Sequence, residues 1–236
     1  MEESGLDYVI KPINIREDEQ FDPEYLKISP NHKIPAIIDH DGPSGETVSL
    51  CESGAILKYV GAKMADKLYP SEPLTQLKVD QWLFFGSAQF TTLAQQYGFF
   101  NIRSPEDIPA GKKHYDVVMR DMFSCLDLHL GDKEYMAGEF SVADISMYSD
   151  THIYGADKWI GFSDYPNLKR WHDSIELRPA VARAWGPYWV GLNALACRSG
   201  TPPPQNIAAE EPVGLRSSHE VSSRHNLADP CDNAGA

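Results

Sequence analysis

Two short stretches decide the fold of this chain: Asn31 to Ile38, which reads NHKIPAII, and Glu52 to Leu57, which reads ESGAIL. The first is an apolar strand that starts with proline, which has no N–H to donate to a sheet. Proline is therefore tolerated at a strand start, at an edge or in a special turn. The Ile34–Pro35 bond is a candidate cis peptide, and a trans proline on an edge strand is the plainer alternative.

The second stretch predicts a strand end that turns directly into a helix. Ser53 stands at the expected cap, where a hydroxyl and the free N–H groups of a helix start bind a carboxylate. Together the two stretches predict one site, in which an extended peptide pairs with the backbone beside Pro35 and its carboxylate sits on the helix start. A Ser53 that acts only as a helix cap is the alternative.

The first third of the chain alternates strands and short helices. Asp22 and Pro23 are typical of a helix start, because aspartate caps the first turn and proline fits its first position. Turn-forming residues separate two of the β-type runs, which predicts an antiparallel hairpin. The expected strands are Tyr8 to Ile13, Ile34 to Asp39 and Thr47 to Cys51, and the expected helices are Asp22 to Ile28 and Ser53 to Met64.

The remainder of the chain is helical in pattern. Ser141 and Asp144 are spaced as a capping box, in which each side chain bonds the other's backbone N–H. The expected helices are Leu74 to Gln96, Lys112 to Leu130, one starting at Ser141, Pro166 to Leu177, and Pro179 to Trp189.

These patterns divide the chain into four parts. Residues 1–68 form an α/β domain, 69–73 a proline-rich linker, and 74–197 an all-helical domain. Residues 198–236 contain a triple proline and few large apolar side chains, so we expect a disordered tail.

Composition excludes several classes of function. With 34 acidic against 21 basic side chains the formal net charge is −13, which disfavours binding to nucleic acid or to an anionic membrane. No apolar run is long enough to span a bilayer, and the N-terminus does not resemble a secretory signal. The four cysteines show no paired spacing, so we expect no metal site, no disulfide framework and a cytoplasmic location.

The proline strand, the Glu52-Ser53 helix start and the later block Phe140 to Ile145 (FSVADI) resemble the glutathione transferase superfamily. More narrowly, the chain is similar to the nu-class and disulfide-bond-reductase branch of bacteria and fungi, from Gly5 through Arg183. This resemblance implies a thioredoxin-like α/β domain followed by an all-α domain.

The resemblance also implies how glutathione binds. Pro35 presents the backbone of Ile34 to the cysteinyl group, and Ser53 holds the γ-glutamyl carboxylate. Glu52 orients the ligand's ammonium group or simply complements the helix N-terminus. Gln20 stands where the branch has a glutamine near the glycine end, and Lys33 either pairs with the glycine carboxylate or is an exposed surface charge.

His114 departs from the branch, which usually has an arginine before Tyr115 that reaches toward glutathione, often across a dimer. Histidine is shorter and only partly charged near neutral pH. His114 is therefore either a weak replacement in a cross-dimer contact or a surface residue.

In the resembled family a strand, a loop and a helix come first, and the loop carries the residue that activates the thiol. Here the segment after Met1 looks like the end of that helix. We therefore expect the first strand to be missing, the thiol-activating residue to lie before Met1, and turnover to be slow or absent. Tyr8 is expected at a strand start rather than as a catalytic tyrosine.

The function implied is that of a glutathione S-transferase-like enzyme with glutathione as cosubstrate. A small electrophile would be conjugated, or a disulfide reduced, by a cytoplasmic homodimer. The alternative is a non-catalytic binding or regulatory module, a use of this fold by fungal nitrogen regulators and translation-factor subunits.

Overall fold

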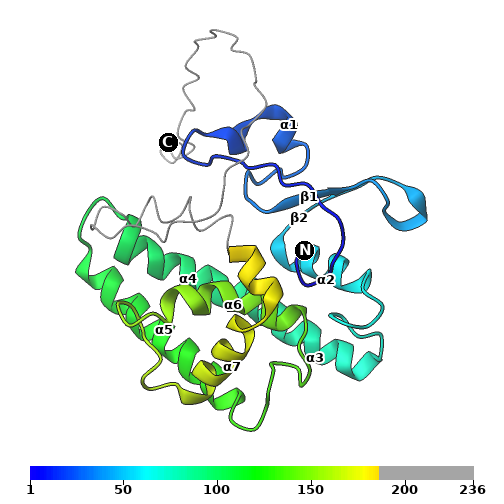
Figure 1. Ribbon diagram of the computed structural model, residues 1–236. Helices are drawn as coiled ribbons and strands as arrows, with labels where there is room; N and C mark the ends of the chain where they lie inside the picture. Colours follow the sequence, from blue (N-terminus) through cyan, green and yellow to red (C-terminus); the bar gives the residue numbers. More distant parts are fainter. Residues whose placement is uncertain (186–236) are drawn as a thin grey trace, which may run out of the picture.

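The computed structural model describes residues 1–185, which form a small N-terminal layer of strands and short helices and a larger bundle of helices. Figure 1 shows the N-terminal part in blue above the helical part in green and yellow. The expected tail, 198–236, lies outside the described residues. So does the end of the helix expected over Pro179 to Trp189, of which residues 179–185 are helical.

The N-terminal part contains two strands and short helices. The helix start expected at Asp22 is confirmed, because its Oδ1 accepts a hydrogen bond from the Glu24 N–H at 2.7 Å and Pro23 takes the first position. The elements are η1 (Glu19–Phe21), α1 (Pro23–Leu26), β1 (Ala36–Asp39), η2 (Pro43–Gly45), β2 (Val48–Cys51) and α2 (Ser53–Ala62).

The expected hairpin is confirmed: β1 pairs antiparallel with β2, with Ala36 opposite Cys51 and Asp39 opposite Val48. Helix α2 fastens to the hairpin through Asp39, whose Oδ2 accepts from the Tyr59 hydroxyl at 2.7 Å and from Lys63 Nζ at 2.5 Å. These bonds hold the C-terminal half of α2 against the strands, and the N-terminal end of α2, where the candidate site lies, follows directly from β2.

The strand expected over Tyr8 to Ile13 is wrong. These residues form no helix or strand, and Val9 is 88% exposed. A β-strand is stabilised by backbone pairing with a neighbour, and β1 and β2 are the only strands paired in a sheet within residues 1–185. High β-propensity alone therefore does not make this segment a strand.

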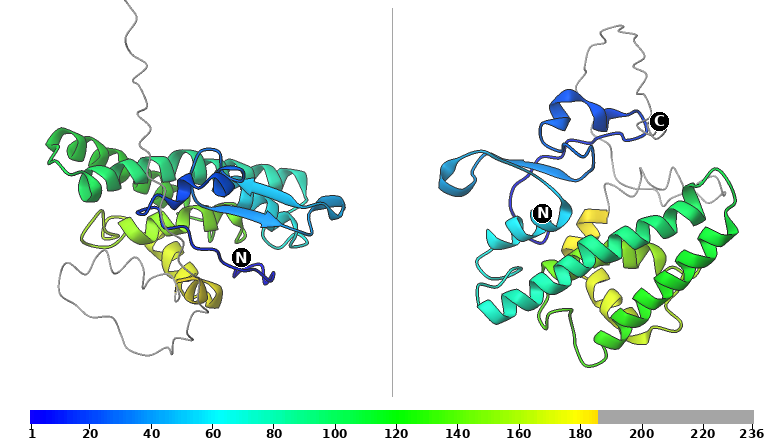
Figure 2. Two further views of the ribbon diagram at one scale, coloured as in Figure 1. Left: turned by 90° about the horizontal axis from the view of Figure 1, so that it is seen from above. Right: turned by 180° about the vertical axis from the view of Figure 1, so that it is seen from behind.

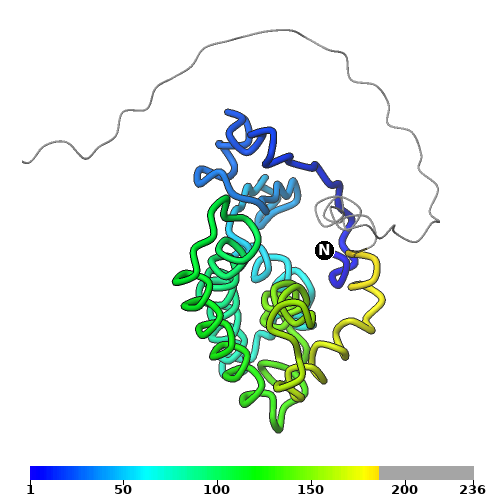
Figure 3. The backbone as a smooth tube through the Cα atoms, turned by 90° about the vertical axis from the view of Figure 1, so that its left-hand side faces the viewer, coloured from blue at the N-terminus to red at the C-terminus, as the bar shows by residue number. Residues whose placement is uncertain are grey.

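The helical part is a bundle around a long, bent rod. In Figure 2 the segments α3 and α4 run as one rod beside α5, and the tube in Figure 3 shows α6 beside them. The elements are α3 (Pro73–Phe84), the π-helical turns η3 (Phe85–Phe90) and η4 (Phe99–Arg103), α4 (Thr91–Gly98), α5 (Pro109–His129), α6 (Val142–Tyr154) and α7 (Pro166–Glu176).

The rod replaces the uninterrupted helix expected over Leu74 to Gln96. The π-helical turn η3 interrupts it where α6 packs closest, and Gly86 lies directly against Ser146 and Met147. A side chain at Gly86 would collide with Ser146. The π-helical turn thus coincides with a tight contact between helices, and the residue pattern of one helix does not reveal such a contact.

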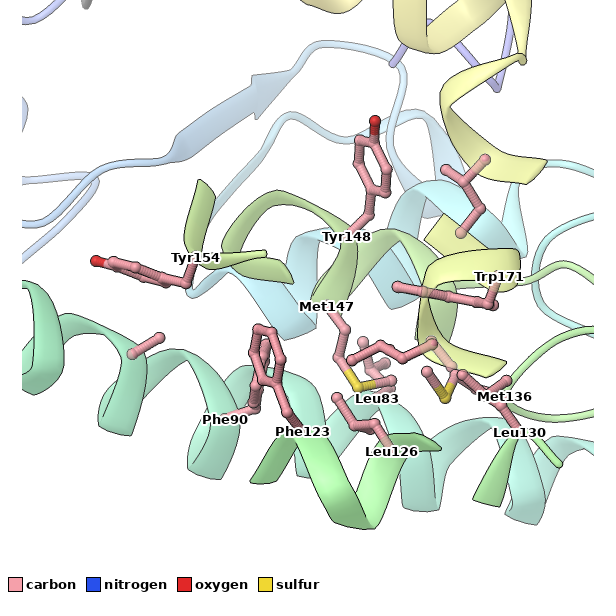
Figure 4. Close-up of a cluster of buried hydrophobic side chains, with 14 of the residues drawn as sticks. Leu83, Phe90, Phe123, Leu126, Leu130, Met136, Met147, Tyr148, Tyr154 and Trp171 are labelled. Atoms are coloured by element: carbon pink, nitrogen blue, oxygen red, sulfur yellow. The ribbon is translucent and has the colours of Figure 1, made fainter. Parts of the chain in front are cut away.

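The core lies between the rod, α5, α6 and α7 (Figure 4). Phe90, Phe123, Met147 and Trp171 are among its fully buried side chains. Burying each such side chain contributes about 1.5–3 kcal/mol, an upper estimate because unfolded chains also bury apolar surface. The capping box expected at the start of α6 is confirmed between Ser141 and Asp144.

Polar contacts join the two parts of the molecule. Asp80 on α3 accepts from Lys58 Nζ on α2 at 3.0 Å and from the Tyr69 hydroxyl at 2.8 Å. Arg178 also pairs with Glu3, Nε to Oε1, at 2.6 Å. These pairs are partly buried, so they fix orientation more than they add stability.

Candidate functional site

The loop before β1 carries the first group of candidate residues. The Ile34–Pro35 bond is cis, as expected, and β1 starts directly after it at Ala36. Ile34 is 51% exposed, and Lys33 and Pro35 are exposed as well. The loop thus offers a solvent-accessible stretch of backbone next to a strand, which an extended peptide can pair with.

The junction between β2 and α2 carries the second group. Glu52, not Ser53, occupies the N-cap position, and it does so with a left-handed φ of 73°. The expectation that Ser53 caps the helix is therefore wrong. The backbone turns at Glu52 through its left-handed conformation, and Ser53 is the first residue of the helix. No side chain caps α2, so its start keeps its capacity to bind an anion.

A direct hydrogen bond brings the two groups together. Asn31 Nδ2 in the loop donates to Glu52 Oε1 at 2.9 Å, although the two residues are 21 positions apart. Exposed backbone at Ile34, an acidic side chain at Glu52 and an uncapped helix start at Ser53 therefore lie around one region. These features suit a ligand with peptide, ammonium and carboxylate groups.

Gln20 lies on η1, near the same loop. The rings of Phe21 and His32 are in contact, with centroids 4.8 Å apart, and this joins η1 to the loop. The Oε1 atom of Gln20 is buried and has no hydrogen-bond partner within the described part of the chain. A buried acceptor without a donor is unfavourable, so this end of the Gln20 side chain has an unmet hydrogen-bonding capacity.

The structure does not bring His114 to these residues within one subunit. It is exposed near the start of α5, where its ring stands edge-on to Tyr115 with centroids 5.0 Å apart.

Sequence reasoning missed three residues that shape the loop. The Tyr25 hydroxyl donates to the Lys33 carbonyl at 2.7 Å, and Ser29 is fully buried beneath the loop. Asn31 opens the stretch Asn31 to Ile38, but the residue pattern predicted no role for its side chain. A polar residue three positions before Ile34 is only a weak signal, because turns commonly carry asparagine and serine.

One cluster among residues 1–185 has side chains suited to a metal. His172, Asp173 and Glu176 on α7 have ligand atoms within 4.8 Å of one another. Asp173 already pairs with Lys169 Nζ at 2.5 Å, and His172 Nδ1 lies 3.2 Å from the other Asp173 oxygen. Ion pairing along a helix face explains this cluster, and it lies away from the candidate site residues in the sequence and on a different element.

Comparison with known proteins gives a consistent result. Residues 1–62 match the family model of the glutathione S-transferase N-terminal domain, and residues 99–184 match that of the C-terminal domain. The disulfide-bond oxidoreductase YfcG of Escherichia coli (strain K12) is 36% identical over 187 residues, which cover 78% of this chain and 86% of the relative.

Solved structures with the same fold include two with oxidised glutathione bound. A glutathione transferase of Pseudomonas putida, with one glutathione disulfide per subunit, superposes with a TM-score of 0.73 at 31% identity, covering 79% of this chain and 83% of that one. The glutathione transferase URE2P6 of Phanerochaete chrysosporium, in complex with oxidised glutathione, gives 0.71 at 28% identity, covering 82% and 88%.

Proposed function

Because this chain belongs to the glutathione S-transferase family, with a thioredoxin-like N-terminal part and a helical C-terminal domain, we propose that it binds glutathione and uses it in thiol chemistry. The observation that carries the proposal is the 2.9 Å hydrogen bond from Asn31 to Glu52. It holds the exposed backbone of Ile34 beside the uncapped start of α2, so one extended tripeptide can contact both.

Each candidate residue has a role in this proposal. The Ile34 backbone, presented by Pro35, pairs with the cysteinyl group. Ser53 and the first N–H groups of α2 hold the γ-glutamyl carboxylate, where the helix dipole favours a negative charge. The Glu52 carboxylate accepts from the ligand's ammonium.

The glycine end of glutathione lies toward Gln20 and Lys33. The unpaired Gln20 Oε1 accepts the N–H of the glycine residue. The exposed Lys33 ammonium pairs with the glycine carboxylate, a contact that solvent weakens because both groups are accessible.

We propose disulfide reduction as the reaction, with thiol conjugation to a small electrophile as the second activity. Two glutathione thiols reduce one disulfide, forming glutathione disulfide and releasing two thiols from the substrate. The thiolate is the reactive form, and a free cysteine thiol has a pKa of about 8.5, so the site must favour deprotonation. The name of the relative YfcG supports disulfide reduction over conjugation.

We also propose that the protein is a cytoplasmic homodimer. Leu74, Leu77 and Phe84 on α3 are 69%, 64% and 61% exposed, and their spacing places them along one face of the helix. Such an apolar stripe favours association. In a dimer His114 would reach the partner's ligand. None of the helices within residues 1–185 has the length and apolarity needed to cross a bilayer.

The test is calorimetric titration of the full chain with glutathione and with glutathione disulfide, followed by assays of disulfide reduction and of conjugation. We expect binding that Ser53→Ala weakens, with Ser124→Ala, an exposed serine on α5, as the matched control. Binding together with disulfide reduction supports the enzyme. Binding without either activity supports a regulatory module, and absence of binding overturns the proposal.

A further inference from the structure

The loop that precedes Pro35 is fastened from inside by a buried hydroxyl. Ser29 has no exposed surface, and its Oγ lies 2.8 Å from Asn31 Oδ1 and 2.7 Å from the Lys33 carbonyl oxygen. The Tyr25 hydroxyl approaches the same Lys33 carbonyl at 2.7 Å. A fully buried serine normally finds hydrogen-bond partners, and here those partners are all in the loop itself.

Asn31 connects this loop to the residue that starts α2. Its Nδ2 donates to Glu52 Oε1 at 2.9 Å, and the backbone at Glu52 is held at φ 73° between β2 and α2. Glu52 is exposed, so without a partner its carboxylate would sample several rotamers. The bond to Asn31 restricts the carboxylate to one side of the helix start.

The available donors and acceptors fix the orientation of the Asn31 amide. An ionised carboxylate only accepts, so Asn31 must turn its NH2 toward Glu52 and its carbonyl toward Ser29. The Ser29 hydroxyl donates to Asn31 Oδ1 or to the Lys33 carbonyl, which both lie within reach, and its Oγ accepts from the Lys33 N–H at 3.3 Å. The Lys33 carbonyl accepts a hydrogen bond from the Tyr25 hydroxyl. Hydrogen bonds from Tyr25 and Ser29 thus hold the loop from Ser29 to Lys33.

We propose that Asn31, supported by Ser29, is a positioning residue that holds the Glu52 carboxylate ready for the α-ammonium group of a γ-glutamyl ligand. This inference rests on the proposed glutathione site. Asn31 does not touch the ligand in this arrangement; it acts by ordering Glu52 before binding. Preordering a glutamate lowers the conformational entropy lost when the ligand binds, so affinity rises without a new contact.

The test compares two ligands that differ only at the ammonium. Glutathione carries it, and glutaryl-cysteinyl-glycine lacks it while keeping the peptide and the thiol. Calorimetric titration of the wild type and of Asn31→Ala with both gives a thermodynamic cycle. We expect the Kd for glutathione to rise about tenfold in Asn31→Ala, the size of one lost preordered contact, and the Kd for the analogue to stay unchanged.

A second variant and a control separate positioning from a structural role. Ser29→Ala should also raise the Kd for glutathione and leave the Kd for the analogue unchanged. The rise should be smaller than in Asn31→Ala, because Asn31 keeps its bond to Glu52 and loses only its contact with the Ser29 hydroxyl. Asn101→Ala should change neither Kd, because its amide bonds the Tyr97 carbonyl on the helical rod. Thermal unfolding of each variant reports whether it is folded.

Two outcomes overturn the inference alone. If Asn31→Ala weakens both ligands equally, the residue only maintains the loop, and if it weakens neither, Glu52 does not depend on it. If the wild type binds neither ligand, the proposed glutathione site itself fails and this inference fails with it. The wild-type titration therefore distinguishes the two failures.

Discussion

Asp144 at the start of α6 accepts a hydrogen bond from Trp171 Nε1 on α7 at 2.8 Å, and both side chains are fully buried. The same carboxylate accepts from the backbone N–H groups of Met136 at 2.9 Å and Ser141 at 3.0 Å. Burial raises the pKa of the Asp144 carboxyl, and these donors oppose that rise. One side chain thus joins α6, α7 and the loop between α5 and α6.

We expect Asp144→Ala to lower the free energy of unfolding by about 3 kcal/mol, because three buried donors lose their acceptor. Ser141→Ala, which removes only the cap hydroxyl, should cost about 1 kcal/mol. Urea unfolding followed by tryptophan fluorescence measures both. Equal losses in the two variants would contradict a central role for the carboxylate.

Asp39 makes stability depend on pH. Hydrogen bonds from Lys63 and Tyr59 lower the pKa of its carboxyl from 3.8 to about 2. Because the folded pKa is the lower one, the stabilisation is present above the unfolded pKa and is lost as the pH falls from about 4 through 2.

The variant Asp39→Asn tests this dependence. We expect it to be less stable than the wild type at pH 6, and we expect the difference to shrink at pH 2.5. Urea midpoints at the two pH values give the comparison, and Asp7→Asn, at an exposed acidic residue, is the control. A difference that does not change with pH would rule out the contribution of the Asp39 carboxylate.

Gln20→Ala separates ligand binding from folding. The buried Oε1 has no partner in the described structure, so removing it should change the free energy of unfolding by less than about 0.5 kcal/mol. Loss of its hydrogen bond to glutathione should raise the Kd about fivefold. Titration calorimetry and thermal unfolding are the measurements, and an unchanged Kd would remove Gln20 from the site.

Leu77→Asp tests the proposed dimer. Leu77 is 64% exposed in the single chain, and a charge placed in a buried interface is costly. We expect the dimer Kd to rise about 30-fold or more in sedimentation velocity. Leu177→Asp, at an 85% exposed leucine after α7, is the matched control. A wild type that sediments as a monomer at micromolar concentration would contradict the proposal.

The sequence alone predicted features that depend on a few neighbouring residues. Asp22 and Pro23 start a helix wherever they occur in this order, since the cap bonds reach only two positions along the chain. The capping box of Ser141 and Asp144 spans three positions. The β1–β2 hairpin follows from two apolar runs and the turn between them, and the candidate cis bond follows from a proline at the start of a strand.

Local patterns failed where a distant segment decides the outcome. Tyr8 to Ile13 has the composition of a strand, but pairing requires a neighbour that the segment itself does not encode. The rod contains the π-helical turn η3, where Gly86 packs against Ser146 on α6, a contact between distant residues that the pattern of one helix does not reveal. Ser53 was expected at the cap position but is the first helical residue, because Glu52 adopts the non-helical conformation of the cap.

The sequence by itself therefore determined the family, the order of helices in the C-terminal domain and the stretches that carry the candidate binding residues. Only the tertiary structure decided that Asn31 holds Glu52, that Ser29 is buried beneath the loop, and that Gln20 keeps an unpaired acceptor. The physical reason is the separation of the interacting residues along the chain. A cap or a turn forms between residues that the chain already holds close, whereas the Asn31–Glu52 bond exists only after the hairpin and α2 have packed together.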